Sequence, residues 1–159
     1  MDSRSVATEL AEFEKNIQAL IALLDAMLPI GRQPNKDQLA AIIDVCAWAH
    51  SEWIRIHPFA NGNGRTARVW ADSIVVRYGL PPFVRFRPRP GVGYVEASMK
   101  AMQGDWKPNA VVFRQLLDDF TKHNPKMTPN GDTSTRNAAG SLPTILAVST
   151  FLALTHPNS

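Results

Sequence analysis

Hydrophobic residues recur every three or four positions along much of the chain, which is the spacing of amphipathic helices. Between residues 6 and 28 the apolar positions are Val6, Leu10, Phe13, Ile17, Leu20, Leu24 and Met27. The breakers Pro29, Gly31 and Pro34 follow directly and end this predicted helix.

A second helix is predicted from the residues after Asn35 to about Ile56. Asn35 is a favourable N-cap, and Gln38 stands at the position that completes a capping box. One side of this helix is apolar, with Leu39, Ile42, Ile43, Cys46, Ala49, Trp53 and Ile56. Pro58 disfavours helical backbone at the preceding residue, so the helix has to end at His57.

Three more helices complete the predicted domain, over residues 65–78, 94–103 and 108–122. Gly79 is suited to the C′ position of the first, and two prolines after it prevent continuation. Residues 83–93 hold too many prolines and glycines for a regular element. Since neither a repeat nor a pair of strands is indicated, the predicted fold class is all-α.

The composition changes after residue 122. We therefore expect a domain over 1–122, and a linker and tail of unknown role over 123–159, beginning with an Asn, Thr, Ser, Pro and Gly-rich stretch at 123–141. The apolar run LPTILAVSTFLALTH is short of the ~20 residues that cross a bilayer. It is either a docked terminal helix or a tail outside the domain, and no membrane partner is expected.

Composition and charge narrow the function classes. The 159 residues are 45% hydrophobic and 19% charged, which indicates one folded domain. Seven arginines and a single acid, Asp72, fall between residues 55 and 89. Such a concentration favours a polyanionic ligand, although a solvated basic face is the alternative. The one cysteine, Cys46, predicts a buried, inert thiol and a cytoplasmic, reducing compartment.

The stretch IHPFANGNGRTAR, residues 56–68, predicts a loop that leads into a helix with positive charge at the junction. The first N–H groups of a helix are free and carry the positive end of its dipole. Gly62, Asn63 and Gly64 can therefore form an anion nest. Arg65 and Arg68 lie three residues apart on the first turn, and arginine binds phosphate oxygens in pairs.

His57 lies at the other end of this loop. Histidine accepts a proton at physiological pH, so a base would stand beside a phosphate cradle. That combination suits phosphoryl or nucleotidyl transfer. Simpler explanations remain open from spacing alone: His57 as a hydrogen-bonded cap, GNG as a turn, and Arg68 paired with Asp72.

The residues HPFANGNGRTAR resemble the signature of the Fic family, HPF-x-[D/E]-GN-[G/K]-R-x-x-R. The preceding AHSEWIRIHPF is similar to the family's His-x-x-Phe-x-x-Ile-His-Pro-Phe, and YVEASMKAMQGD to its Tyr-x-x-Ala-Leu-x-x-Ala-x-x-Gly-Asp. The resemblance covers roughly residues 7 to 120. It implies a helical core with the motif loop between two central helices.

The resemblance also implies an activity, which is transfer of AMP from ATP to a Ser, Thr or Tyr hydroxyl of a target protein. His57 would be the general base, and Phe59 would anchor the loop in the core. The phosphates would lie on Gly62, Asn63, Gly64, Arg65 and Arg68. At position 64 the chain resembles the AMP-transferring branch of the family, which carries glycine there. The phosphate-transferring Doc relatives carry lysine at this position.

The chain departs from the family pattern in three places. Asn61 replaces the carboxylate that holds Mg²⁺, and a neutral amide oxygen is a weak ligand for this hard cation. The family's flap hairpin, expected before residue 6, is not found in the sequence, so we expect either an N-terminally truncated Fic domain or one that holds its target in another way. The inhibitory motif [S/T]-x-x-x-E-[G/N] is also absent, so any inhibition would come from a separate protein.

Two other functions remain as alternatives to AMP transfer. One is a module that binds a nucleotide or phosphate with little or no transfer, and the other is Fic-type transfer of another nucleotide or of phosphate. Nucleic acid is not an expected partner. Arg85, Arg87 and Arg89 form a basic strip, but prolines interrupt it and no recognition motif accompanies it.

Overall fold

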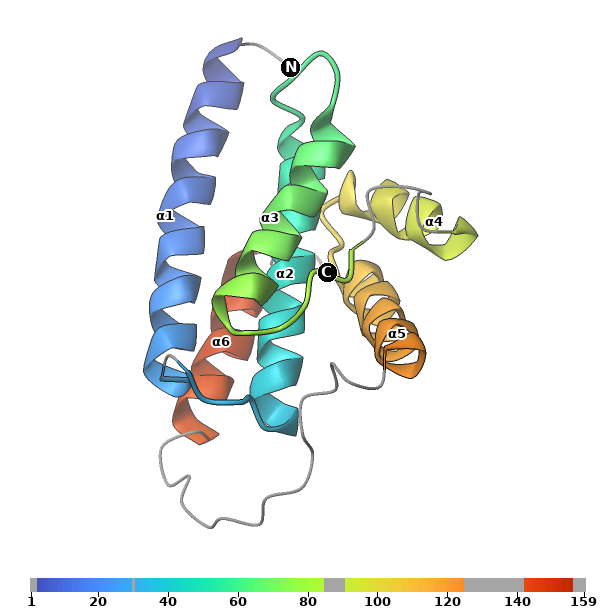
Figure 1. Cartoon of the computed structure of the whole chain (residues 1–159). Helices are drawn as coiled ribbons and strands as arrows, with labels where there is room; N and C mark the ends of the chain where they lie inside the picture. Colours follow the sequence, from blue (N-terminus) through green and yellow to red (C-terminus); the bar gives the residue numbers. More distant parts are fainter. Residues whose placement is uncertain (1–2, 30, 85–90, 125–141, 156–159) are drawn as a thin grey trace.

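The computed structural model describes residues 3–29, 31–84, 91–124 and 142–155 (Figure 1). This part of the chain forms six helices and no strand, which confirms the predicted all-α class. The helices are α1 (Ser3–Met27), α2 (Lys36–Ile56), α3 (Asn63–Arg77), α4 (Val92–Ala101), α5 (Lys107–His123) and α6 (Leu142–Thr155).

Helix α2 is the centre of the fold, because each of the other five helices packs against it (Figure 1). The sequence predicted that one side of α2 is buried, and a larger part of the helix surface is. Trp48, His50 and Ile54, outside that predicted side, are buried as well. A helix surrounded by neighbours is buried nearly all round, and its polar residues then need partners inside the protein.

Aromatic rings join the first three helices. Phe13 of α1 stacks on Trp48 of α2 with ring centroids 5.7 Å apart. The same ring meets Trp53 of α2 edge-on at 5.5 Å and Trp70 of α3 at 5.2 Å. Aromatic pairs in these geometries stabilise a core beyond the area that they bury. The cluster lies directly beneath the connection from α2 to α3, because Trp53 belongs to the last turn of α2.

The ends of the helices follow the local signals in the sequence. The predicted capping box is confirmed: Asn35 Oδ1 accepts from Gln38 N at 2.9 Å, and Gln38 Oε1 accepts from Asn35 N at 2.9 Å. Gln38 also donates to the carbonyl of Met27 at 2.9 Å, which ties α2 to the end of α1. Gly79 follows α3 with a φ of 73°, as expected for a C′ residue.

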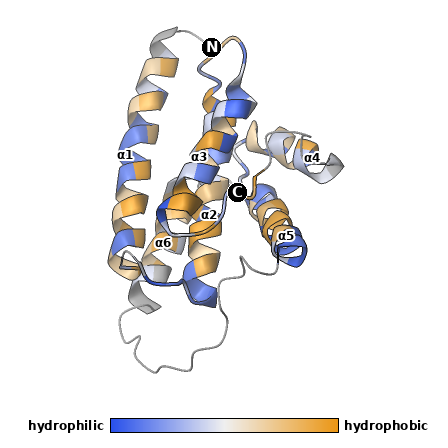
Figure 2. Ribbon diagram, viewed as in Figure 1, coloured by the Kyte–Doolittle hydropathy of each residue, from blue (hydrophilic) through white to orange (hydrophobic). Residues whose placement is uncertain are grey.

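Helix α6 packs against α1 and α2, alongside the lower half of both in Figure 1. Val148 and Leu152 enter the core from this helix. Hydrophilic and hydrophobic residues alternate along α1, whereas α6 is mostly hydrophobic (Figure 2). The predicted linker at 123–141 falls mainly outside the described residues. Among these, no helix combines the length and the apolar character needed to cross a bilayer.

Replacing the N-cap of α2 tests the importance of the capping box. We expect Asn35→Ala to lower the free energy of unfolding by roughly 1–2 kcal/mol, because the backbone N–H of Gln38 loses its acceptor, Asn35 Oδ1. Urea denaturation measures the change. Gln115→Ala, an exposed position within α5, is the control and should change stability by less than about 0.5 kcal/mol. Equal effects of the two substitutions would contradict the role of the cap.

Candidate functional site at the connection between α2 and α3

The connection from α2 to α3 begins with a left-handed residue. His57 is the C-cap of α2, with φ 52° and ψ 54°, and its backbone N–H donates to the carbonyl of Trp53 at 3.1 Å. Among the described residues, His57 is the one non-glycine residue with positive φ. Such backbone costs roughly 1–3 kcal/mol and is concentrated at functional sites. The turn directs the chain out of α2 and leaves the His57 side chain exposed.

The imidazole of His57 is oriented by its own helix. Its Nδ1 lies 3.4 Å from the carbonyl oxygen of Ile54, which is a long hydrogen bond. Because a carbonyl only accepts, this contact favours the tautomer with hydrogen on Nδ1. The Nε2 lone pair is then directed away from α2 and can accept a proton.

The side chain of Asn63 closes the loop. Its Oδ1 accepts from the backbone N–H of Phe59 at 3.0 Å, and its Nδ2 donates to the backbone carbonyl of Phe59 at 2.5 Å. Asn63 is only 3% exposed, so its side of both bonds is buried. The predicted phosphate contact of Asn63 is therefore left to its backbone N–H, since its amide is committed to the loop.

The first turn of α3 presents backbone N–H groups to the loop. The carbonyl of Gly62 accepts from the N–H of Arg65 at 2.9 Å and of Thr66 at 3.0 Å. The N–H groups of Asn63 and Gly64 precede this ladder, as the first donors of a helix do. Gly62 adopts φ 92°, which favours glycine. The residues of the predicted nest thus lie on a glycine turn and at the start of a helix.

Both arginines of the motif fold back toward this turn. Arg65 Nη2 lies 3.3 Å from the position that a Cβ on Gly62 would occupy. Arg68 Nη1 lies 3.7 Å from the corresponding position on Gly64. The two guanidinium groups therefore flank the start of α3, where the helix dipole also favours an anion. Arg65 is exposed, whereas Arg68 is 4% exposed.

Arg68 makes contacts that the sequence did not indicate. Its Nη1 donates to the hydroxyl of Tyr94 at 3.1 Å, and that hydroxyl lies 2.7 Å from His50 Nε2. His50 and Tyr94 both fall in stretches that resemble the family, but they are 44 residues apart in sequence. Helical periodicity gives no information about such a distant pair. Asp72, the predicted alternative partner of Arg68, accepts from the backbone N–H of Val84 at 3.1 Å, and the nearby charge of Arg68 opposes the rise that burial causes in the pKa of Asp72.

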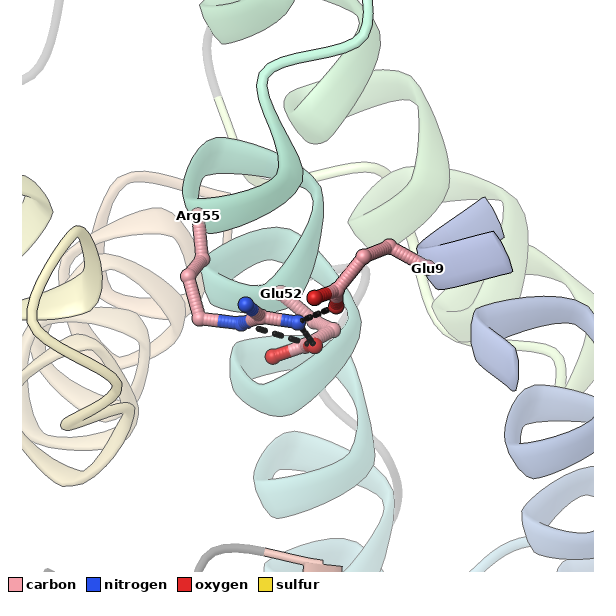
Figure 3. A network of polar contacts seen from close by, with 3 residues as sticks. All are labelled: Glu9, Glu52 and Arg55. Atoms are coloured by element: carbon pink, nitrogen blue, oxygen red, sulfur yellow. Dashed lines mark hydrogen bonds and ion pairs between the residues drawn. The ribbon is translucent and has the colours of Figure 1, made fainter. Parts of the chain in front are cut away.

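Other arginines of the basic segment are committed elsewhere. Arg55 lies between Glu52 of its own helix and Glu9 of α1, and its Nε donates to Glu52 Oε1 at 2.9 Å (Figure 3). Arg77 forms a two-pronged pair with Asp25 of α1, at 3.1 and 2.6 Å. Both join helices instead of adding to a ligand site. The basic strip at 85–90 lies outside the described residues.

The expected anchoring of Phe59 in the core is wrong. The ring is 48% exposed and only leans on Trp53, with centroids 5.8 Å apart. The cluster beneath the loop already contains four rings, those of Phe13, Trp48, Trp53 and Trp70, and Phe59 lies on its solvent side. The backbone of Phe59 fixes the loop through Asn63, and its side chain remains half open to solvent.

Cys46 is a buried free thiol, as predicted. The thiol is completely buried in α2, and burial with the nearby charges of Asp72 and Asp44 raises its pKa well above the usual value. A neutral, inaccessible thiol is inert.

Comparisons with known proteins point to one family. Residues 3–75, just under half of the chain, match the model described as the Fic/DOC family. A protein adenylyltransferase Fic of Nematostella vectensis is 42% identical over 67 residues, which is 42% of this chain and 15% of that protein. Proteins of the same name from Drosophila persimilis and Aedes aegypti are 40% and 33% identical over 80 residues, half of this chain and 15% of each.

The chain thus aligns with about a seventh of the length of these curated relatives, since each matched segment is 15% of the relative. No solved structure gives a significant match. The matched segment contains α1, α2, the connecting loop and most of α3. It therefore includes His57, Asn63 and both arginines of the motif.

The resemblance implies Mg²⁺ at the position of Asn61. The Asn61 side chain is exposed and offers one neutral amide oxygen. The motif from His57 to Arg68 contains no carboxylate, and the described residues include no cluster of three or more His, Cys, Asp or Glu side chains. Magnesium prefers carboxylate and phosphate oxygens. These residues do not fit a metal held by the protein.

Removing the Asn63 side chain tests how the loop is held. We expect Asn63→Ala to lower the free energy of unfolding by roughly 1–3 kcal/mol, because both backbone groups of Phe59 lose buried partners. Amide hydrogen exchange at residues 59–62 should also accelerate. Asn61→Ala removes the same side chain from an exposed position and should change neither quantity. An Asn63→Ala protein with the stability and exchange of Asn61→Ala would disprove the loop closure.

Proposed function

From the match of residues 3–75 to the Fic/DOC family model, we propose that the chain is a Fic-type enzyme that transfers AMP from ATP to a Ser, Thr or Tyr hydroxyl of a target protein. One observation carries the proposal. A single short loop joins an exposed histidine in left-handed backbone to a helix start that two guanidinium groups flank. The names of the relatives, each a protein adenylyltransferase Fic, agree with it.

His57 acts as the general base in this proposal. The oxygen of the target hydroxyl attacks the α-phosphorus of ATP, while its proton moves to His57 Nε2. The bond between the α-phosphorus and the bridging oxygen of the β-phosphate breaks, and pyrophosphate leaves. The carbonyl of Ile54 stabilises the Nδ1–H tautomer and so keeps Nε2 available for the proton.

The first turn of α3 holds the part of ATP that becomes pyrophosphate. Backbone N–H groups at Asn63 and Gly64, with Arg65 and Arg68, would bind the β- and γ-phosphates. Negative charge grows on these oxygens as the bond breaks, so fixed donors stabilise the transition state more than bound ATP. Any Mg²⁺ would enter with ATP and be held mainly by phosphate and water.

A nucleotide- or phosphate-binding module is the second candidate. It is favoured by Asn61, because the loop offers no carboxylate for a metal that would activate the α-phosphate. Fic-type transfer of another nucleotide or of phosphate uses the same residues. Incubation with ATP labelled at the α or the γ position separates these functions. Protein-bound α label supports AMP transfer, γ label supports phosphate transfer, and neither supports the binding module.

The histidine variant tests the base directly. We expect His57→Ala to reduce transfer of α label by about 10²–10⁴-fold, because proton removal from the hydroxyl loses its acceptor. Affinity for ATP, measured by calorimetry, should change by less than about twofold, since His57 lies outside the phosphate cradle. His123→Ala, an exposed histidine at the end of α5, is the control. Transfer at the wild-type rate by the His57→Ala protein would show that His57 is not the general base.

The Asn61 position tests the importance of the missing carboxylate. Asn61→Asp adds one negative charge at nearly constant size, so it should repel bare ATP and attract its magnesium complex. We expect ATP affinity below wild type in a chelator, and transfer above wild type with magnesium. Both are measured across a magnesium titration, with Asn61→Gln as the neutral control. Flat or lower transfer at every concentration would favour the binding module instead.

A further inference from the structure

The hydroxyl of Tyr94 joins two buried side chains from different helices. Arg68 Nη1 of α3 lies 3.1 Å from the Tyr94 oxygen, and His50 Nε2 of α2 lies 2.7 Å from the same oxygen. The guanidinium carbon of Arg68 also stands 5.9 Å from the centroid of the Tyr94 ring, where the face of the ring attracts a cation. All three residues are less than 9% exposed, so water does not replace these contacts.

The direction of each hydrogen bond follows from the chemistry of its donor. Arginine only donates, so the Tyr94 oxygen accepts from Arg68. The hydrogen of the Tyr94 hydroxyl is then left for His50 Nε2. Burial, with the charge of Arg68, lowers the pKa of His50 to about 3, so this imidazole is neutral and can accept there. The chain of donation therefore runs from Arg68 through Tyr94 to His50.

The tautomer of His50 with its hydrogen on Nε2 leaves more buried polar groups without a hydrogen-bond partner. His50 Nδ1 is buried and has no hydrogen-bond partner among the described residues, whichever nitrogen carries the hydrogen. If Nε2 donated to Tyr94, the hydroxyl hydrogen would lose its acceptor as well. A buried group without a partner costs roughly 1–3 kcal/mol, so the arrangement with one such group is favoured. His50 thus fixes the rotation of the Tyr94 hydroxyl.

Arg68 Nη1, the nitrogen that donates to Tyr94, also lies beside the start of α3. Arg68 Nη1 lies 3.7 Å from the Cβ position of Gly64, beside the first turn. A free arginine side chain loses rotamer freedom when it binds a phosphate, and that loss weakens binding. A guanidinium already restrained by a hydroxyl and an aromatic ring avoids much of this cost. Arg65, which is exposed, has no contact of this kind among its described neighbours.

We infer that Tyr94, oriented by His50, is a positioning residue that holds Arg68 at the first turn of α3 for the phosphates of a nucleotide. The inference rests on the proposed nucleotide site. It adds two residues, from α2 and α4, to a site otherwise formed by the loop and α3. Helix α4 then supports the phosphate cradle indirectly, through Tyr94 and Arg68, and none of its residues has to touch the ligand.

The test measures the affinities of the full chain for ATP and AMP by calorimetry. Tyr94→Phe keeps the ring and removes only the hydroxyl. It should weaken ATP binding by about three- to tenfold and AMP binding by less than about twofold, because only ATP carries β- and γ-phosphates. Tyr78→Phe is the matched control. It removes a hydroxyl that lies 3.0 Å from Asp25 Oδ1, between the end of α3 and α1, and should leave the ratio of affinities unchanged.

A double variant separates positioning from general loosening of the fold. In an Arg68→Ala protein, adding Tyr94→Phe should cause no further loss of ATP affinity, because Tyr94 acts through Arg68. An additional loss there, or a wild-type ratio in Tyr94→Phe, would overturn the positioning role alone. Equal affinity of the wild-type chain for ATP and AMP would overturn the nucleotide site itself, and this inference with it.

Discussion

The geometry of the site depends on one constraint: the chain leaves α2 at Ile56 and begins α3 at Asn63, with six residues between them. The left-handed backbone of His57 makes the first bend, and Gly62 makes the last. The amide of Asn63 joins the two ends by bonding both backbone groups of Phe59. The aromatic cluster around Phe13 supports this turn from beneath, so the loop is held in place without burying its own phenylalanine.

The electrostatic character of the site comes from two arginines and a helix start, more than from the basic composition of the segment. Arg55 and Arg77 are neutralised by carboxylates of α1, and they hold the helices together. Arg65 and Arg68 remain at the first turn of α3, one exposed and one buried. This division suits a polyphosphate, since the exposed arginine can adapt to the ligand while the buried one is fixed in advance.

Sequence reasoning succeeded where the signal is local. Asn35 with Gln38, Pro58 and Gly79 each fix a helix end through the backbone of a few neighbouring residues, and these ends were predicted. The loop motif was also local, so the placement of Arg65 and Arg68 near the start of α3 could be predicted. Because α3 begins at Asn63, two residues before the predicted start, Arg68 lies on the second turn and only its side chain reaches back to the first. The exposure of Phe59 could not, because it depends on which rings from other helices fill the space beneath the loop. The contact between His50 and Tyr94 was missed for the same reason.

The central claim is that the first turn of α3 binds the β- and γ-phosphates of a nucleotide. It is tested most directly by following backbone amide NMR signals of the wild-type chain during titration with ATP, ADP and AMP. The account predicts the largest shifts at Gly62, Asn63 and Gly64, with affinity decreasing in the order ATP, ADP, AMP as phosphates are removed. Equal affinities for the three nucleotides, or shifts confined to other parts of the chain, would contradict it.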